Sequence, residues 1–364
     1  VRIPDDAICA HANQSRIRTF NQKDKKNVMF SKDCITFARE KGWFSGKDAD
    51  FSFCEAYAYP DFSGRRFCEA RVWSFFNHFS TDMERYLPYA EGKVKDAEPM
   101  PLWIKPNRKV SVQDIQECMR DHYEGTPFSL DKDPGQGVWN MPYRPTPLTY
   151  KVDGKEYFNE RPTSTQQTAF SYVAQLRSWL PRQIGGVLWF GNDDGNMVAY
   201  TPVYCGNTSQ PECYNTKGAD AVTFSMKNAF WVCNWVSNMV YPRYSLMFGS
   251  LKSVRDSLET SYFSAQAEIE RKAMVLYDEN PSLAIDFLTD YSIDKAQQMI
   301  DRWRQLGTYL IVKYNDMAIK PDEDGRFIRT ETGLGATVER PGFPENVARE
   351  IVKSSGDRYA VPEE

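Results

Sequence analysis

The stretch AFSYVAQLRSWLPRQIGGVLWFGNDDGNMVAYTPVYCG, residues 169–206, contains the clearest fold signal in the sequence. Three runs within it are rich in β-branched and aromatic residues, and turn-forming residues separate them. The run GNDDGN, residues 191–196, has the composition of a hairpin turn between the second and third runs. Because sequential strands joined by short turns pair antiparallel, residues 163–204 predict an antiparallel sheet.

The sequence that follows this sheet has a helical pattern. Residues 222–248 form a first helical segment, and residues 251–278 carry apolar side chains along one stripe. Pro281 is placed to start the next helix, since the first helical residue needs no hydrogen-bonded N–H. We expect a further helix to begin at Ser292. Residues from Asp316 onward are rich in Pro, Gly and charged residues, and we expect them to form a surface tail that wraps the body.

The sequence before the sheet predicts one strand and several helices. Residues 5–17 alternate in polarity, so Ile8, Ala10 and Ala12 should lie on one face of a strand, against a core. Helices and strands in this order indicate an α+β fold. The other elements expected here are a helix from a Ser31 cap to Gly42, a helix over 67–79, an extended segment PLWIKP over 101–106, and a helix over 111–123 with a Ser111 cap.

The composition excludes several classes of partner. The chain has 364 residues, of which 41% are apolar and 14% aromatic, which is enough to build a sizeable core. Its net charge is −4 with acidic and basic residues interspersed, whereas a nucleic-acid-binding protein usually presents a basic face. The longest apolar run, residues 229–241, is shorter than the ~20 residues that a membrane-spanning helix needs. We therefore expect no nucleic-acid partner and no membrane partner.

The eight cysteines include no CxxC motif and the three histidines no HExxH motif, so the sequence predicts no metal site. P-loop and GxGxxG signals are absent too, and we expect no cofactor. Cys205 and Cys213 lie in one loop and are the two cysteines that can pair. Cys118 and His122 are one helical turn apart, but a mid-helix Cys lacks the N-terminal helix dipole that lowers a thiol pKa.

Two polar residues have both a structural and a functional interpretation. Arg71 lies in the apolar stretch 67–79, where a guanidinium needs partners. It can form a salt bridge with Glu69 or Asp61, rest its stem on apolar surface, or reach into a site and hold a carboxylate or a nucleophile. Asn13 ends the first predicted strand, and its amide can either close a turn or donate to an oxyanion. Taken alone, these patterns favour the structural interpretation of both residues.

A set of short sequence segments in a fixed order favours the functional interpretation of both residues instead. They are RIPDD, AHANQSRI, SKDCITFAREKGWF, RRFCEARVWSFF, PLWIKP, MRDHYEGTPFSL, YFNERPTSTQQTAFSYVAQLRSWLP, IGGVLWFG and TPVYCG. Their order and content resemble the bacterial dipeptidase A family of cysteine peptidases, to which the secernins are related. The resemblance extends from Val1 to about Asn315.

This resemblance implies an N-terminal-nucleophile hydrolase, a class whose fold is a four-layer αββα sandwich. Residues 1–215 would form the C-terminal part of that sandwich, residues 216–315 a helical layer packed on it, and residues 316–364 the surface tail. The resemblance also implies that Asn13 lines the oxyanion hole and that Arg71 sits beside the nucleophile and steadies its charge. Asn13 and Arg71 are therefore the candidate catalytic residues.

The family's nucleophile is a Cys freed at the N-terminus, and none of the eight cysteines here stands at that position. We therefore expect the nucleophile upstream of Val1, in an N-terminal portion of the same protein, and expect this chain alone to be inactive. The expected activity is hydrolysis of dipeptides through an acyl-enzyme, with small peptides as substrates and homo-oligomer formation left open. Two alternatives remain: a non-catalytic, secernin-like interaction protein, and an amidase of acylated amino acids or bile-salt-like amides. Sequence does not define the compartment, which can be cytoplasmic or exported.

Overall fold

The computed structural model describes residues 1–363 and divides them into two compact units. The first unit contains Val1–Ser129 and Tyr143–Thr163, and the second contains Leu130–Pro142 and the chain from Ser164 onward. Helices and small antiparallel sheets occur in both units, so the α+β class predicted from the sequence is confirmed. The predicted boundaries at residues 215 and 315 stay predictions.

In the first unit a buried apolar cluster holds several short helices together. Trp73, Phe76 and Tyr123 are central members of this cluster, and the predicted apolar helix over 67–79 supplies the first two. That segment is helical from its start, but it begins as a π-helix, Gly64–Glu69, before it becomes α-helical. The α-helices of the unit are α1 Cys34–Glu40, α2 Phe53–Tyr57, α3 Ala70–Asn77, α4 Leu87–Glu91 and α5 Val112–Met119.

The predicted strand over 5–17 is real but much shorter. Only β1, Ile8–Cys9, pairs, and its partner is β2, Trp103–Ile104, which confirms the extended PLWIKP segment. Ile8, Ala10 and Ala12 pack against the core cluster, as their alternation predicts. The strand stops early because the chain turns sharply: Asn13 has a φ of +57°, in the left-handed region.

The N-terminal cap predicted from the sequence is present at α5 but not at α1. Ser111 accepts a hydrogen bond from the backbone N–H of Asp114, whose carboxylate accepts from the Ser111 N–H, and this forms a capping box. The predicted Ser31 cap is wrong, because α1 begins at Cys34 with Asp33 at the N-cap position. The unit also contains a hairpin of β3, Thr149–Val152, and β4, Lys155–Phe158.

The second unit contains the sheet predicted from the opening stretch. Its strands are β5 Phe170–Leu176, β6 Gly186–Asn192 and β7 Thr201–Tyr204, and they pair antiparallel in the order β5-β6-β7. A single helical turn, α6 Arg182–Gly185, lies in the β5–β6 connection, and the turn around GNDDGN joins β6 to β7. The predicted antiparallel strands and turn are therefore confirmed.

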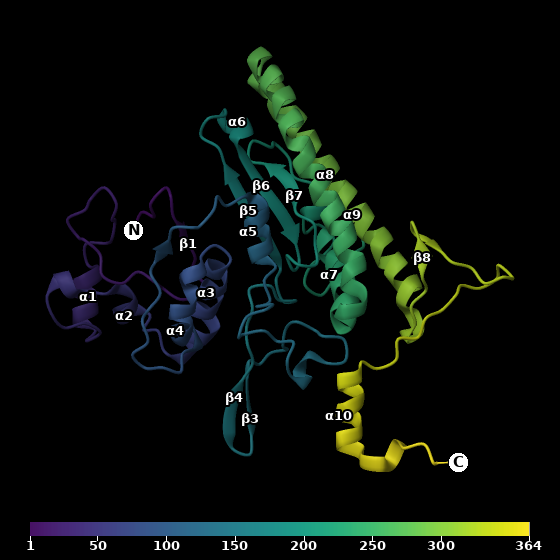
Figure 1. Cartoon of the computed structure of the whole chain (residues 1–364). Coiled ribbons are helices and arrows are strands. Elements are labelled where there is room, and N and C mark those ends of the chain that lie inside the picture. Colours follow the sequence, from purple (N-terminus) through teal and green to yellow (C-terminus); the bar gives the residue numbers. More distant parts are fainter. Residues whose placement is uncertain (364) are drawn as a thin grey trace. The chain divides into compact units, whose positions relative to one another are not determined.

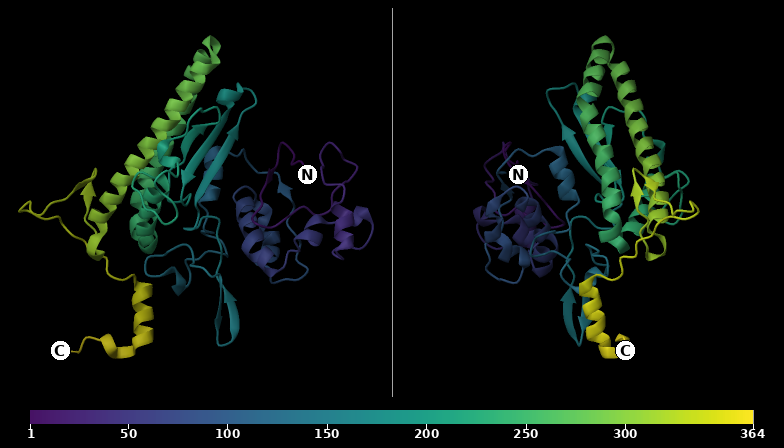
Figure 2. Two further views of the ribbon diagram at one scale, coloured as in Figure 1. Left: turned by 180° about the vertical axis from the view of Figure 1, so that it is seen from behind. Right: turned by 45° about the vertical axis from the view of Figure 1, so that its right-hand side comes forward.

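Long helices cover one face of this sheet (Figures 1 and 2). The helices are α7 Ala229–Val240, α8 Tyr244–Glu279 and α9 Pro281–Tyr314. Trp189 of β6 stacks on Phe263 of α8 with ring centroids 4.2 Å apart, and the Tyr204 N–H donates to Ser292 Oγ of α9 at 3.2 Å. The opposite face of the sheet leaves Phe170, Tyr172 and Leu176 exposed.

Pro281 starts α9 as predicted, with the Asn280 side chain accepting from the Ser282 N–H. The prediction that another helix begins at Ser292 is wrong. Ser292 lies inside the continuous helix α9, fully buried, and its hydroxyl donates to the Leu288 carbonyl one turn earlier. Serine is common at helix starts, but it is also accommodated inside a helix when its hydroxyl bonds in this way.

The last segment has little contact with a core. It forms the small hairpin of β8 Asp322–Glu323 and β9 Arg326–Phe327, and then α10 Glu345–Ser355. No described residue after Ala318 is buried. All eight cysteines are free, with Cys205 exposed and Cys213 buried, so the pairing considered for these two residues does not form. None of the described helices is both long enough and apolar enough to cross a membrane.

Candidate active site

Asn13 and Arg71 come together in the first unit, although 58 positions separate them in the sequence. Arg71 lies in the first turn of α3, and its Nη2 donates to Asn13 Oδ1 at 2.9 Å. Its Nε donates to the Phe67 carbonyl, four residues earlier, at 2.8 Å. These two hydrogen bonds hold the planar guanidinium at the end of its helix and aim it at the loop that carries Asn13.

The structural salt bridges considered for Arg71 do not form. Glu69 pairs instead with Arg16, and Asp61 accepts a hydrogen bond from the Gly64 backbone N–H. Among the described residues, no carboxylate lies within ion-pair distance of the Arg71 guanidinium. Arg71 is half-buried. Its positive charge is therefore not neutralised by an acid among the described residues. Such a cation is suited to an anionic group that approaches from outside.

The contact with Arg71 also fixes the orientation of the Asn13 amide. A guanidinium only donates hydrogen bonds, so it must face the amide oxygen rather than the amide nitrogen. In the described part of the chain the Asn13 Nδ2 makes no hydrogen bond, and Asn13 is exposed. The amide therefore presents its N–H donors outward. A donor held in a fixed direction is what an oxyanion requires.

Buried groups around Arg71 set the electrostatics of the site. Burial lowers the pKa of Arg71 and, in the neighbouring Cys68, raises the pKa of the thiol. Tyr123 is fully buried and donates its hydroxyl to the Arg161 carbonyl at 2.9 Å, and burial raises its pKa well above the usual value. Cys68 and Tyr123 are therefore neutral near pH 7, and the charges that act on this site are those of Arg71 and the neighbouring Arg161.

The π-helix that leads into Arg71 was not predicted from the sequence. π-Helical turns are rare in proteins, but those that do occur are often located at functional sites. The π-helix begins at Gly64, where a Cβ would lie only 2.6 Å from Gln14 Oε1, so a larger residue there would require the Gln14 side chain to move. The Gln14 amide donates in turn to the Ala58 carbonyl. No periodicity distinguishes a π-helix from an α-helix over six residues, which is why the sequence gives no signal for it.

A cysteine–histidine contact near this loop does not form an activated pair. Cys9 Sγ lies 3.5 Å from His11 Nε2. Burial raises the pKa of Cys9 and lowers the pKa of His11, so both groups are neutral near pH 7. A nucleophilic cysteine needs the opposite shifts, with a thiolate beside a charged imidazolium. Cys118 is likewise inactive, because burial raises its pKa to about 12, and the His122 ring bonds to Glu124.

Two fully buried carboxyl groups in the β6–β7 turn were also missed. Asp193 accepts hydrogen bonds from Asn234 Nδ2 at 2.9 Å and from Ser237 Oγ at 2.8 Å, both on α7. Asp194 accepts from the hydroxyls of Ser164 and Tyr241. Burial raises the pKa of Asp193 to about 7. The sequence marks GNDDGN as a turn, but it does not reveal that both carboxyl groups point into the core.

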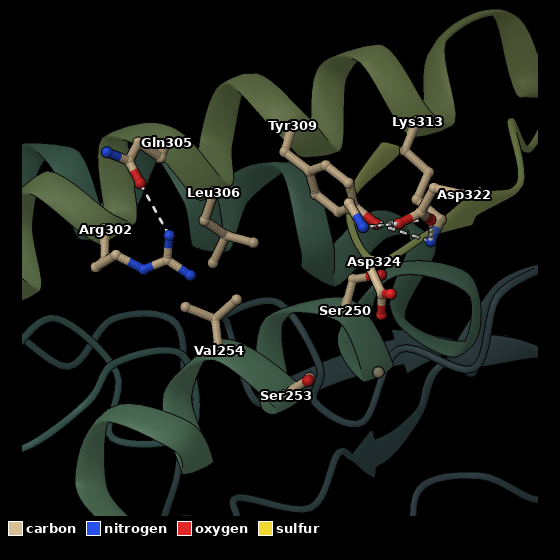
Figure 3. A pocket seen from close by; sticks show the side chains of 12 residues that line it. Ser250, Ser253, Val254, Arg302, Gln305, Leu306, Tyr309, Lys313, Asp322 and Asp324 are labelled. Carbon is tan, nitrogen blue, oxygen red and sulfur yellow. Dashed lines mark hydrogen bonds and ion pairs between the residues drawn. The ribbon is translucent and has the colours of Figure 1, made fainter. Parts of the chain in front are cut away.

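A cavity of about 620 Å³ lies in the second unit, between α8, α9 and the β8–β9 hairpin (Figure 3). At one end Lys313 Nζ lies 2.5 Å from Asp322 Oδ1, and the Tyr309 hydroxyl donates to the same oxygen at 2.9 Å. Lys313 and Asp322 therefore neutralise each other. Ser250 Oγ is paired with the Tyr314 hydroxyl at 2.8 Å. The lining combines apolar and polar side chains, and the partner of the Ser250 hydroxyl is a tyrosine rather than a carboxylate or an imidazole.

No cluster of three or more His, Cys, Asp and Glu side chains in residues 1–363 is arranged to hold a metal ion. The strongest arrangement for chemistry in the described chain is thus an outward amide donor on Asn13, fixed by a half-buried guanidinium on Arg71. It can stabilise negative charge on a reacting group, but it supplies no nucleophile of its own.

Comparison with known proteins identifies the family of the chain. The model of peptidase family C69 matches residues 1–257. A probable dipeptidase of Salmonella dublin is 28% identical over 206 residues, which is 57% of this chain and 41% of that protein. A probable dipeptidase of Latilactobacillus sakei is 25% identical over 292 residues, which is 79% of this chain and 54% of that protein. Dipeptidase A of Lactobacillus helveticus is 23% identical over 231 residues, which is 64% of this chain and 42% of that protein. The chain spans about half the length of these relatives. It belongs to peptidase family C69.

Proposed function

We propose that the full-length protein is a cysteine-type dipeptidase in which Asn13 and Arg71 stabilise negative charge during peptide hydrolysis. Membership of a peptidase family and the names of the relatives support the reaction class. The observation that carries the site assignment is the 2.9 Å hydrogen bond from Arg71 to Asn13, which turns the amide donors outward. The chain described here supplies this charge-stabilising half of the active site.

The proposed nucleophile is the thiol of an N-terminal Cys in the processed full-length protein. The α-amino group of such a residue has a pKa of ~7.7–8.0, so it can accept the thiol proton near neutral pH without a histidine. The thiolate attacks the peptide carbonyl, the amine leaves with a proton, and water then hydrolyses the acyl-enzyme. During both steps the carbonyl oxygen becomes negative, and the Asn13 N–H is the donor that we assign to it. Arg71 steadies the thiolate.

The same proposal includes the layered αββα sandwich of N-terminal-nucleophile hydrolases. Its support is the uncovered face of the β5–β6–β7 sheet. Phe170, Tyr172 and Leu176 on β5 are 55%, 51% and 76% exposed, and they alternate with the buried Ser171 and Val173. A sheet with one face under helices and an apolar face left open fits a structure in which a second sheet packs on that face.

The test is hydrolysis by the full-length protein of an unblocked dipeptide and of its N-acetylated counterpart, with intact-mass detection of the acyl-enzyme. We expect turnover of the unblocked dipeptide and an acyl adduct on the N-terminal Cys. Turnover of the acylated compound alone would replace the dipeptidase proposal with an amidase. No turnover of either compound by a correctly processed protein would favour a non-catalytic interaction protein.

A further inference from the structure

A buried ion pair ties the two candidate catalytic segments together. Arg16 Nε donates to Glu69 Oε1 at 2.8 Å, and the side chains are only 2% and 4% exposed. Arg16 lies three positions after Asn13, and Glu69 lies two positions before Arg71. The pair therefore joins the loop that carries the amide to the helix that carries the guanidinium.

Arg16 also closes the loop on which Asn13 sits. Its Nη1 donates to the Ala10 carbonyl at 3.2 Å, so a side chain from one end of the segment 10–16 bonds to the main chain at the other end. Asn13 is at the middle of this segment and has a left-handed backbone conformation. A loop closed at its base in this way has few conformations available, which limits the positions of the residue at its apex.

Further contacts fix the guanidinium of Arg16 itself. It donates to the Leu102 carbonyl at 3.0 Å and to the Pro101 carbonyl at 2.8 Å, just before β2, and it lies over the Phe76 ring of α3 at 5.4 Å. Four hydrogen bonds to three separate segments leave Arg16 little freedom. Because Arg is a rigid planar donor, each bond constrains the direction of the others.

These contacts complete a closed circuit of four residues. The circuit runs from Asn13 along the loop to Arg16, across the ion pair to Glu69, along the helix to Arg71, and back to Asn13 through the 2.9 Å hydrogen bond. We propose that Arg16 and Glu69 are positioning residues, which set the direction of the Asn13 donor and the Arg71 charge without touching substrate. This inference rests on the proposed function for its kinetic consequence.

The circuit has a thermodynamic rationale. Burying two charges removes them from water, and an apolar pair of similar size is often as stabilising as a buried ion pair. Burial raises the pKa of Glu69, and the charge and hydrogen bond of Arg16 oppose that change, so Arg16 favours the ionised carboxylate. A pair that adds little net stability is instead suited to defining one geometry, and loss of either partner leaves an uncompensated buried group.

The test uses the full-length protein and the variants Glu69→Gln, Arg16→Lys and Arg16→Met. Glu69→Gln keeps the shape and an acceptor for Arg16 but removes the charge. Arg16→Lys keeps the charge but has a single nitrogen for four acceptors. We expect kcat to fall by about 10- to 100-fold while KM stays within about twofold of wild type. A misplacement of active-site groups by about 1 Å can lower the reaction rate by up to about 100-fold. Arg16→Lys should lie between wild type and Arg16→Met.

The matched control is Glu98→Gln. Arg85 and Glu98 form an ion pair in the same unit, but their side chains are 58% and 51% exposed and the pair is outside the circuit. We expect wild-type kcat in this variant. Urea unfolding of each variant at the assay temperature identifies the variants that are folded, and kinetics are compared among these only.

A second measurement does not depend on activity. In protein labelled with ¹⁵N at Asn and Arg, the side-chain signals of Asn13 and Arg71 report their mutual geometry, and we expect both to shift in folded Glu69→Gln and Arg16→Lys. Absence of dipeptide hydrolysis by wild type would refute the proposed function but leave these shifts as the test of positioning. Unchanged signals and wild-type kcat in the folded variants would overturn the inference.

Discussion

Replacing Asn13 with Ala in the full-length protein removes the amide that faces outward from Arg71. In the described chain the amide makes one hydrogen bond, to Arg71 through Oδ1, and its Nδ2 is free to donate. Loss of one oxyanion donor typically lowers kcat by ~10²–10³-fold, or about 2.7–4 kcal/mol in the barrier. The free energy of unfolding should fall by only about 1–2 kcal/mol, because Asn13 is exposed. The change to Ala removes one hydrogen bond, and Ala tolerates the positive φ at this position less well than Asn does.

Two further variants separate these contributions. Asn13→Gly also removes the amide but suits the left-handed backbone, so it should lower kcat as Asn13→Ala does with less loss of stability. Asn13→Asp keeps an oxygen for Arg71 but replaces the donor with a negative charge, so it should lower kcat at least as much. The assay is steady-state hydrolysis of an unblocked dipeptide, with urea unfolding as the measure of stability. A kcat within twofold of wild type in folded Asn13→Ala and Asn13→Asp would refute the oxyanion assignment.

Two other predictions concern stability. Burial raises the pKa of Asp193 to about 7, above the ~3.9 of an unfolded Asp, so the folded state favours the protonated form. The stability associated with this proton is complete below pH ~4 and is lost as the pH rises through 7, by at most on the order of 4 kcal/mol. Asp193→Asn should therefore gain stability relative to wild type between pH 4 and pH 8 in urea titrations, and a constant difference across that range would contradict the assigned cause. Gly307 of α9 approaches Trp235 so closely that a Cβ would lie 2.1 Å from the ring, whereas a Cβ on Gly249 of α8 meets nothing within 4 Å. Gly307→Ala should lower the free energy of unfolding by ~1–3 kcal/mol and Gly249→Ala should raise it by up to about 1 kcal/mol, and equal changes in the two variants would show that close approach is not the reason for Gly307.

Local patterns predicted most of the regular structure in the second unit. The strands around GNDDGN and the start of a helix at Pro281 each depend on residues within a few positions of one another. The Ser292 error has the same origin. A local rule predicts a helix start at a Ser, but the structure buries this Ser inside α9, where it bonds one turn back.

The features that define the candidate site are non-local, and pattern alone did not predict them. Asn13 and Arg71 were identified individually, through the family resemblance, but their contact joins positions 58 apart. The Arg16–Glu69 pair joins positions 53 apart and produces no periodic signal. Glu69 was considered as a partner for Arg71 because neighbouring opposite charges suggest an ion pair. No local pattern indicates that Arg16, 53 positions away, pairs with this carboxylate instead.

The central claim is that Asn13 and Arg71 act as one unit, and a double-mutant cycle in kcat/KM measures this most directly. The cycle compares wild-type full-length protein with Asn13→Ala, Arg71→Ala and the double variant on an unblocked dipeptide. Because each residue depends on the other for its orientation, the double variant should lose about as much activity as the more damaging single variant. Losses that multiply, so that the double variant falls by the product of the two single effects, would show that the residues act independently and would contradict the account.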